Sequence, residues 1–237
     1  MKHPTYLRQL HAGRDFATTD PVARQMDNFV YLLGDGERRE CLVVDPAWDV
    51  DGIVRCAEAD DMTIRGALVS HWHPDHVGGN LMGHDVQGLA RFRELVDVPI
   101  YVHEADAPWV QAMTGLAGSD LAPVQNGHRI AVGAVEVECL HTPGHTEGSQ
   151  CFRCGQALVS GDTLFLEGCG RTDLPGGDIE EMWRTLSERL LALPADLVLY
   201  PGHDYGDRPH APLGEVRQTN AMLQAPDYAT FLARRGA

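Results

Sequence analysis

Three histidines and an aspartate lie within six residues of the chain, at His71, His73, Asp75 and His76. They directly follow the apolar run 66–69, which predicts a buried strand, and the C-terminal ends of strands are where open α/β sheets commonly hold ligands. His71 and His73 are two residues apart, so in extended backbone both point to the same side. Imidazoles and a carboxylate at this density are difficult to bury without a cation between them. The cluster therefore predicts a transition-metal site rather than an exposed polar loop.

Apolar runs bounded by turn residues predict strands with helices between them. The expected strands are residues 6–13, 28–33, 40–46, 66–69, 99–102, 134–140, 150–153, 157–160 and 196–200. The expected helices are residues 49–59, 89–96, 104–113 and 178–191, with a last one beginning near residue 214. We expect a loop at 83–88 and irregular structure at 114–127. No linker, repeat or low-complexity tract interrupts the pattern, so a single domain spanning residues 1–237 is expected.

Further metal-binding side chains follow later strands, at His145, Asp162 and His203. Their similar local positions suggest that they converge with the first cluster on one rim. Seven such side chains suit two adjacent ions. One ion would be held by His71, His73 and His145, and the other by Asp75, His76 and His203. Asp162 could bridge the two ions. Two such ions could share a hydroxide formed near neutral pH. Ligation by nitrogen and oxygen alone suits Zn²⁺, Fe²⁺ or Mn²⁺.

Composition excludes several classes of partner. The formal net charge of −15 argues against a nucleic-acid backbone and against an anionic membrane surface. No apolar run approaches transmembrane length, and the first residues lack the apolar segment of a signal peptide. The six cysteines are scattered, which indicates reduced thiols. We therefore expect a cytoplasmic protein. The Cys151-x-x-Cys154 spacing alone is a weak signal for metal or redox chemistry.

Four motifs occur in an order and spacing that resembles the metallo-β-lactamase superfamily, over roughly residues 6–220. They are Ser70-His-x-His-x-Asp-His76, Thr142-Pro-Gly-His145-Thr, Ser160-Gly-Asp162-Thr and Pro201-Gly-His203-Asp. The resemblance implies an α/β fold of the αββα sandwich type, two mixed β-sheets flanked by helices, with the metals at one edge. The lactamases themselves typically have a cysteine where Asp162 stands.

Within the superfamily, the stretch 161–178 is similar to glyoxalase II-type thioester hydrolases and to persulfide dioxygenases. This resemblance implies a substrate-binding role for Tyr205, which matches a tyrosine that binds the thiol tripeptide in glyoxalase II. Arg171 could pair with a substrate carboxylate, and Cys169, beside the metal loop, is a third candidate substrate residue. The long type of glyoxalase II (hydroxyacylglutathione hydrolase) has a lysine and a tyrosine where Arg171 and Asp173 stand. It also has a helical C-terminal domain that holds glutathione, whereas only a short tail follows His203 here.

The favoured function is a metallohydrolase that cleaves a small S-acyl thiol, a thioester, by a metal-bound hydroxide. Two divalent ions are expected, zinc before iron or manganese, with Asp75 and Asp162 as catalytic carboxylates. A thiolate leaving group has a pKa near ~8.5 and departs with little protonation. Asp75 is then free to bind metal instead of serving as a general acid.

Two alternatives stay open. One is an iron-dependent persulfide dioxygenase, which the resemblance implies would hold a single iron through His71, His145 and Asp162. The other is a metal-binding partner protein without enzymatic activity. A homo-oligomer is compatible with the sequence, and residues 81–95 could form a lid over the site. Trp72 and Trp109 are expected in packing roles.

Overall fold

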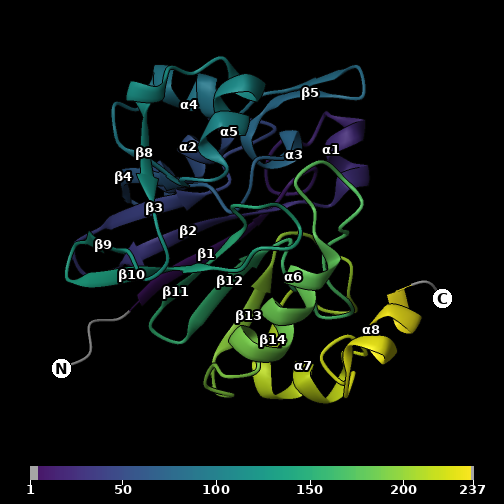
Figure 1. Cartoon of the computed structure of the whole chain (residues 1–237). Helices are drawn as coiled ribbons and strands as arrows, with labels where there is room; N and C mark the ends of the chain where they lie inside the picture. The colour runs from purple at the N-terminus through teal and green to yellow at the C-terminus, as the bar shows by residue number, and fades with distance from the viewer. Residues whose placement is uncertain (1–4, 236–237) are drawn as a thin grey trace.

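Two six-stranded β-sheets stack face to face, with helices on both outer faces, in the computed structural model, which describes residues 5–235 (Figure 1). In Figure 1, α2, α4 and α5 lie over the first sheet, and α6 and α7 lie beside the second. The expectation of an αββα sandwich with two mixed sheets is confirmed. Within residues 5–235, no helix combines the length and the apolar character needed to span a bilayer.

The first sheet has the order β1-β2-β3-β4-β7-β8. The pairs β1–β2 and β2–β3 are antiparallel, and the three remaining pairs are parallel. Its strands are β1 (Thr5–His11), β2 (Phe29–Asp35), β3 (Glu40–Val44), β4 (Thr63–Leu68), β7 (Ile100–His103) and β8 (Leu121–Val124).

The second sheet has the order β14-β13-β12-β11-β10-β9. Only β12 and β13 pair in parallel among the described strands of this sheet. Its strands are β9 (Arg129–Val132), β10 (Val135–His141), β11 (Gln150–Cys154), β12 (Ala157–Gly161), β13 (Val198–Pro201) and β14 (Ala211–Pro212). A separate hairpin consists of β5 (Gly79–Leu81) and β6 (His84–Val86).

The helices connect the strands and cover the two outer faces. They are α1 (Pro21–Met26), α2 (Val50–Ala59), α3 (Pro74–Val77), α4 (Leu89–Leu95), α5 (Ala107–Thr114), α6 (Ile179–Arg184), α7 (Leu213–Thr219) and α8 (Tyr228–Arg235). A short 3₁₀ turn, η1 (Gly118–Asp120), precedes β8, and α6 continues into π-helical turns, η2 (Thr185–Leu190).

The alternating direction of side chains along the strands explains why both faces of each sheet are covered. In β2, Tyr31 and Leu33 pack between the sheets, whereas Val30 and Leu32 pack under the helices of the first layer. Successive strand residues point to opposite faces, so an unbroken apolar strand needs a partner on each side. Cys151 and Cys154 follow the same rule on β11 and lie in different hydrophobic layers, so they do not form a joint site.

Two local predictions were wrong. Residues 83–88 were expected to form a loop, but 84–86 are strand β6. Met82 and Gly83 have φ of 50° and 95°, the left-handed backbone that a tight two-residue hairpin needs. Residues 114–127 were expected to be irregular, but they contain η1 and β8. Strand β8 lies at the edge of its sheet and tolerates Pro123, and its pairing with distant β7 has no local sequence signal.

Candidate metal centre

The candidate ligands occupy loops at one end of the sandwich. His71 and His73 follow β4 of the first sheet, whereas His145, Asp162 and His203 follow β10, β12 and β13 of the second. Asp75 and His76 lie on the single turn of α3, which begins at Pro74. A proline suits the first position of a helix because its missing N–H has no partner there in any case. All seven predicted residues are therefore brought together from both sheets.

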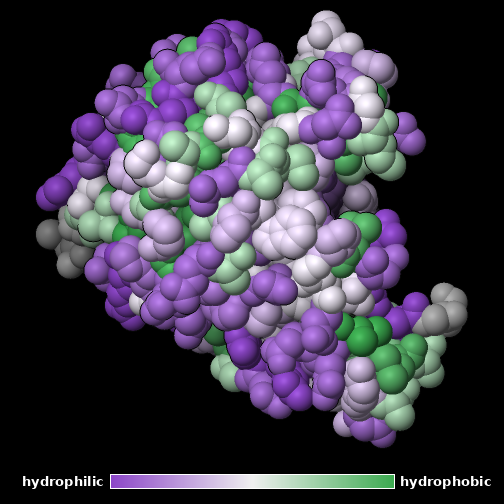
Figure 2. Space-filling model, turned by 45° about the horizontal axis from the view of Figure 1, so that its top comes forward, coloured by the Kyte–Doolittle hydropathy of each residue, from purple (hydrophilic) through white to green (hydrophobic). Residues whose placement is uncertain are grey.

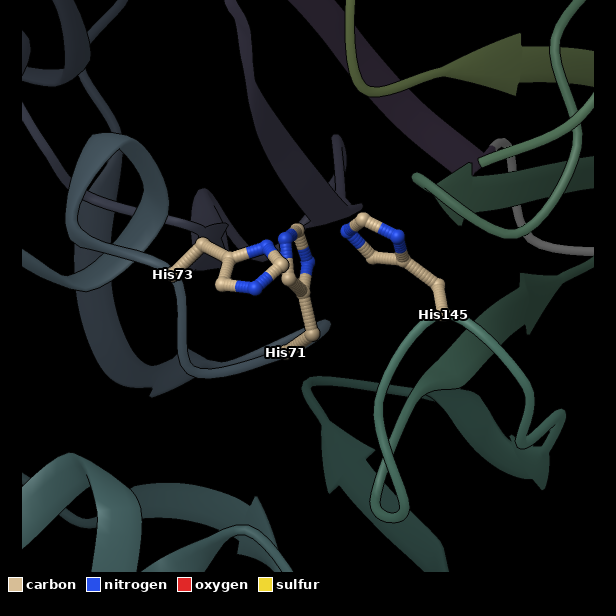
Figure 3. A group of neighbouring side chains, drawn as sticks. All are labelled: His71, His73 and His145. Atoms are coloured by element: carbon tan, nitrogen blue, oxygen red, sulfur yellow. The ribbon is translucent and has the colours of Figure 1, made fainter. Parts of the chain in front are cut away.

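The first group consists of His71, His73 and His145. One nitrogen from each ring lies within 4.8 Å of the others, and in Figure 3 the three rings turn toward a common space. All three are buried, and within residues 5–235 their Nε2 atoms have no hydrogen-bond partner. The His145 Nδ1 donates to the backbone oxygen of Arg171 at 2.6 Å, which leaves its Nε2 lone pair directed inward.

The second group consists of Asp75, His76 and His203. The two imidazole Nε2 atoms are 3.2 Å apart, and Asp75 Oδ2 lies 3.3 Å from one and 3.4 Å from the other. The His203 Nδ1 donates to the backbone oxygen of Met26 at 2.7 Å, which fixes the ring with its other nitrogen toward Asp75. Three donor atoms of this kind at this spacing could hold one ion.

Asp162 lies between the two groups. Its Oδ2 is 3.3 Å from His203 Nε2 and 3.8 Å from His145 Nε2, and its Oδ1 is 3.5 Å from His76 Nε2. A Cβ on Gly202 would stand 2.2 Å from Asp162 Oδ1, so the glycine before His203 allows the carboxylate to approach. Asp162 could therefore contact an ion in either group.

Two residues that the sequence did not single out orient these ligands. Asp45 is buried, accepts hydrogen bonds from Ser70 N at 2.7 Å and Ser70 Oγ at 2.5 Å, and accepts a third from His76 Nδ1 at 2.9 Å. Asp45 also lies within reach of an ion shared with His71 and His76, but its oxygens already serve these donors. Asn28 donates to Asp75 Oδ2 at 3.0 Å. The only available signal for Asp45 was its position after a strand that proves to be the neighbour of β4.

Burial and neighbouring charges shift the pKa of the candidate ligands. Burial lowers the pKa of His71 and of His145, and it lowers the pKa of His73 to about 4, so these imidazoles are neutral and have a free lone pair. Burial opposes ionisation of Asp75 and Asp162, but the adjacent His76 and His203 hold the pKa of both carboxyls well below its ordinary value.

The donor set fits divalent metal ions. Neutral imidazoles and ionised carboxylates are the forms that bind metal. Burial opposes protonation of His76 and His203, but the neighbouring carboxylates raise the pKa of both, so an ion in the second group would take the place of the protons on these two rings. Within residues 5–235, Asp162 Oδ1 and the Nε2 atoms of His71, His73 and His145 are buried without a hydrogen-bond partner. Buried polar atoms are nearly always satisfied, so the three imidazole nitrogens gathered in one space call for a ligand there. The nitrogen and oxygen donors suit zinc, iron or manganese.

A cavity of about 490 Å³ opens over both groups. Its lining includes His73, Asp75, His145, Asp162 and His203 and also the three predicted substrate residues, Cys169, Arg171 and Tyr205. The Tyr205 ring stacks on His203, with centroids 4.6 Å apart, and the exposed Arg171 guanidinium pairs with Asp173 at 2.7 Å. Cys169 is buried, and burial raises the pKa of its thiol to about 11.

The remaining predicted features fall outside the metal groups. In residues 81–95, only Leu81 and Met82 line the cavity, because helix α4 packs into the core through Leu89 and Phe92. Trp72 and Trp109 stack with ring centroids 4.8 Å apart, beside the loop that contains His71 and His73.

The fold and the clustered ligands define a metal-binding α/β sandwich, and the profile described as "Metallo-beta-lactamase superfamily" matches residues 24–203. The chain belongs to this superfamily. It is 37% identical over 182 residues to a hydroxyacylglutathione hydrolase of Polaromonas sp., an alignment that spans 75% of this chain and 62% of that protein.

Two crystal structures are similar in fold. ETHE1 from Myxococcus xanthus has a TM-score of 0.77 at 24% identity, covering 96% of this chain and 88% of that one. TTHA1623 in a di-iron-bound form has a TM-score of 0.67 at 30% identity, covering 82% of this chain and 94% of that one.

Proposed function

We propose that the protein is a metal-dependent hydrolase of small thioesters with a two-ion site. The single observation that carries the proposal is the division of the ligands into two compact groups with Asp162 between them. We assign one ion to His71, His73 and His145 and the other to Asp75, His76 and His203, with Asp162 bridging. The di-iron form of TTHA1623 supports two ions, and the nitrogen and oxygen donors suit zinc first.

Divalent ions bound here would acidify a water molecule toward neutral pH and polarise the carbonyl of the substrate. The protein's own part is to hold these ions, in part with carboxylates that are not protonated at neutral pH. Because the pKa of Asp75 and that of Asp162 both lie well below the ordinary value, each remains a carboxylate at neutral pH. Asp75 therefore has no proton to donate, and a thiolate, with a pKa near ~8.5, is a leaving group that needs none.

Three residues at the cavity are proposed to position the substrate. Arg171 is exposed and could exchange Asp173 for a substrate carboxylate in the same two-pronged geometry. Tyr205 presents its ring beside His203, and Cys169 lines the wall. The similarity to hydroxyacylglutathione hydrolase supports a small acyl-thiol substrate. We propose in addition that the protein is cytoplasmic, consists of a single domain and binds neither nucleic acid nor membrane.

The persulfide dioxygenase and the non-enzymatic metal protein are the outcomes against which this proposal is tested. Anaerobically purified protein is supplied with S-acyl thiols and, separately, with a persulfide in the presence of O₂. Release of free thiol from the S-acyl substrates supports the hydrolase. Uptake of O₂ on the persulfide without thioester cleavage overturns it, and metal-loaded protein inactive toward every substrate favours the partner protein.

A further inference from the structure

A hairpin places an exposed apolar side chain at the mouth of the metal cavity. Met82 lies at the turn between β5 and β6, is 94% exposed, and still lines the cavity. It is the most exposed of the large hydrophobic residues described in 5–235. A lone exposed apolar residue needs no explanation, but one that borders a ligand cavity is available to a ligand.

Both strands of this hairpin are held by contacts with other elements, so the position of Met82 is set by the fold. His84 Nε2 lies 3.0 Å from Asp20 Oδ2. A Cβ on Gly79 would stand 2.8 Å from Met113 Cγ, which shows how closely the hairpin packs on α5. The hairpin is therefore held at Gly79 of β5 and at His84 of β6, while Met82 in the turn stays exposed. Methionine adapts its flexible thioether to varied apolar shapes.

The wall around Met82 is apolar. Six lining residues from separate segments of the chain lack charge or hydrogen-bonding side chains: Met26, Pro74, Leu81, Met82, Phe165 and Leu174. Arg171 is the one arginine or lysine of the described cavity lining, so the lining offers a single cationic partner to a substrate carboxylate. Figure 2 shows green apolar side chains distributed between hydrophilic ones, on the left of the face and along its right edge. Such a lining is poorly suited to a thiol carrier with several carboxylates.

We infer that this wall, with Met82 at its rim, is a subsite for an apolar acyl group on the substrate. The inference rests on the proposed thioester hydrolysis and specifies its substrate class. The acyl carbon would face the metal groups, the acyl chain would contact Leu81, Met82 and Leu174, and the thiol side would leave toward Arg171. Favourable contact of this kind scales with the apolar area removed from water.

The test uses S-acyl esters of N-acetylcysteamine, a neutral thiol, with acetyl, butyryl, hexanoyl and octanoyl groups. For the zinc-loaded protein, kcat/KM should rise by roughly 2- to 4-fold per methylene that enters the cavity. In Met82→Ser the increase in kcat/KM from the acetyl to the octanoyl ester should be several-fold smaller, while Met82→Leu should retain the wild-type increase. The matched control is Leu95→Ser, a partly exposed apolar residue outside the cavity, which should behave like the wild type.

A second readout separates this inference from the hydrolase proposal. Calorimetry measures binding of S-alkyl thioethers, which cannot be hydrolysed, from ethyl to octyl. Affinity that increases with chain length and depends on Met82, in a protein that cleaves no thioester, would overturn the hydrolase and leave the apolar subsite in place. Equal kcat/KM for acetyl and octanoyl esters, or affinity independent of chain length, would overturn the subsite.

Discussion

Asp45→Asn tests whether a buried carboxylate fixes the tautomer of a metal ligand. In the wild type, Asp45 accepts from Ser70 N, Ser70 Oγ and His76 Nδ1. Asparagine has a similar shape and tolerates the left-handed backbone of this position, where φ is 53°. Its single oxygen should turn to the Ser70 N–H, a donor that cannot change. Its amide N–H₂ would then face His76, which must accept at Nδ1 and hold its proton on Nε2.

The magnitude follows from these contacts. Loss of one charge-assisted hydrogen bond should lower the free energy of unfolding by about 1.5–3 kcal/mol. Loss of an outer carboxylate partner typically weakens metal affinity by about 10–100-fold. The ion assigned to Asp75, His76 and His203 should be affected more than the other, because His76 donates to Asp45 directly. In the other group, only His71 is linked to Asp45, and only through Ser70 Oγ, which lies 3.0 Å from its Nδ1.

Calorimetric titration of metal-free protein with zinc gives the two affinities, and chemical unfolding gives the stability. The matched control is Asp35→Asn, which also alters a buried carboxylate but one that accepts from backbone N–H groups, including Ala134 N at 2.6 Å. It should lose stability and retain both affinities. If Asp45→Asn binds two zinc ions as tightly as the wild type, the tautomer argument is wrong.

Three further predictions concern the bridge, the substrate and pH. Asp162→Ala should lose most of its metal affinity and nearly all activity; a fully metallated, active variant, by metal analysis and rate, would exclude a bridging role. Arg171→Ala should raise KM for an anionic acyl-thiol several-fold with little change in kcat, and an unchanged KM would remove Arg171 from the substrate site. Asp106 is buried against Thr146 Oγ1 and Gly148 N, and burial raises its pKa to about 6, above the ordinary 3.8. The stabilising contribution of protonated Asp106 is therefore complete below pH ~4 and lost as pH rises through about 6. Relative to the wild type, the free energy of unfolding of metal-free Asp106→Asn should therefore increase by up to about 3 kcal/mol between pH 4 and 8, as measured by unfolding titrations. A difference between the two proteins that is independent of pH would contradict this.

The candidate ligands could be predicted because each one is marked by the residues next to it in the sequence. His71, His145, Asp162 and His203 each come directly after or near the end of an apolar run, and strand ends of one sandwich meet at one edge. The alternation of apolar residues also predicted most strands. These signals are local, since they depend on the spacing of residues along the chain.

Features that depend on distant pairing could not be predicted in the same way. Asp45 acquires its role only because β3 and β4 are parallel neighbours, which brings its carboxylate to Ser70 and His76. Asn28 reaches Asp75 across 47 residues of sequence. Strand β8 exists because β7 provides a partner, and the hairpin turn depends on a left-handed backbone at Met82, which propensity disfavours.

The number of metal ions bound per chain tests the central claim most directly. Protein purified anaerobically and loaded with zinc, iron or manganese is dialysed and measured by elemental analysis, alongside His203→Ala and His73→Ala. The two-group arrangement predicts two ions per wild-type chain and about one in each variant, because each substitution removes a ligand from one group only. A single iron in the wild type, unchanged in both variants, would contradict the two-ion site and favour the set His71, His145 and Asp162.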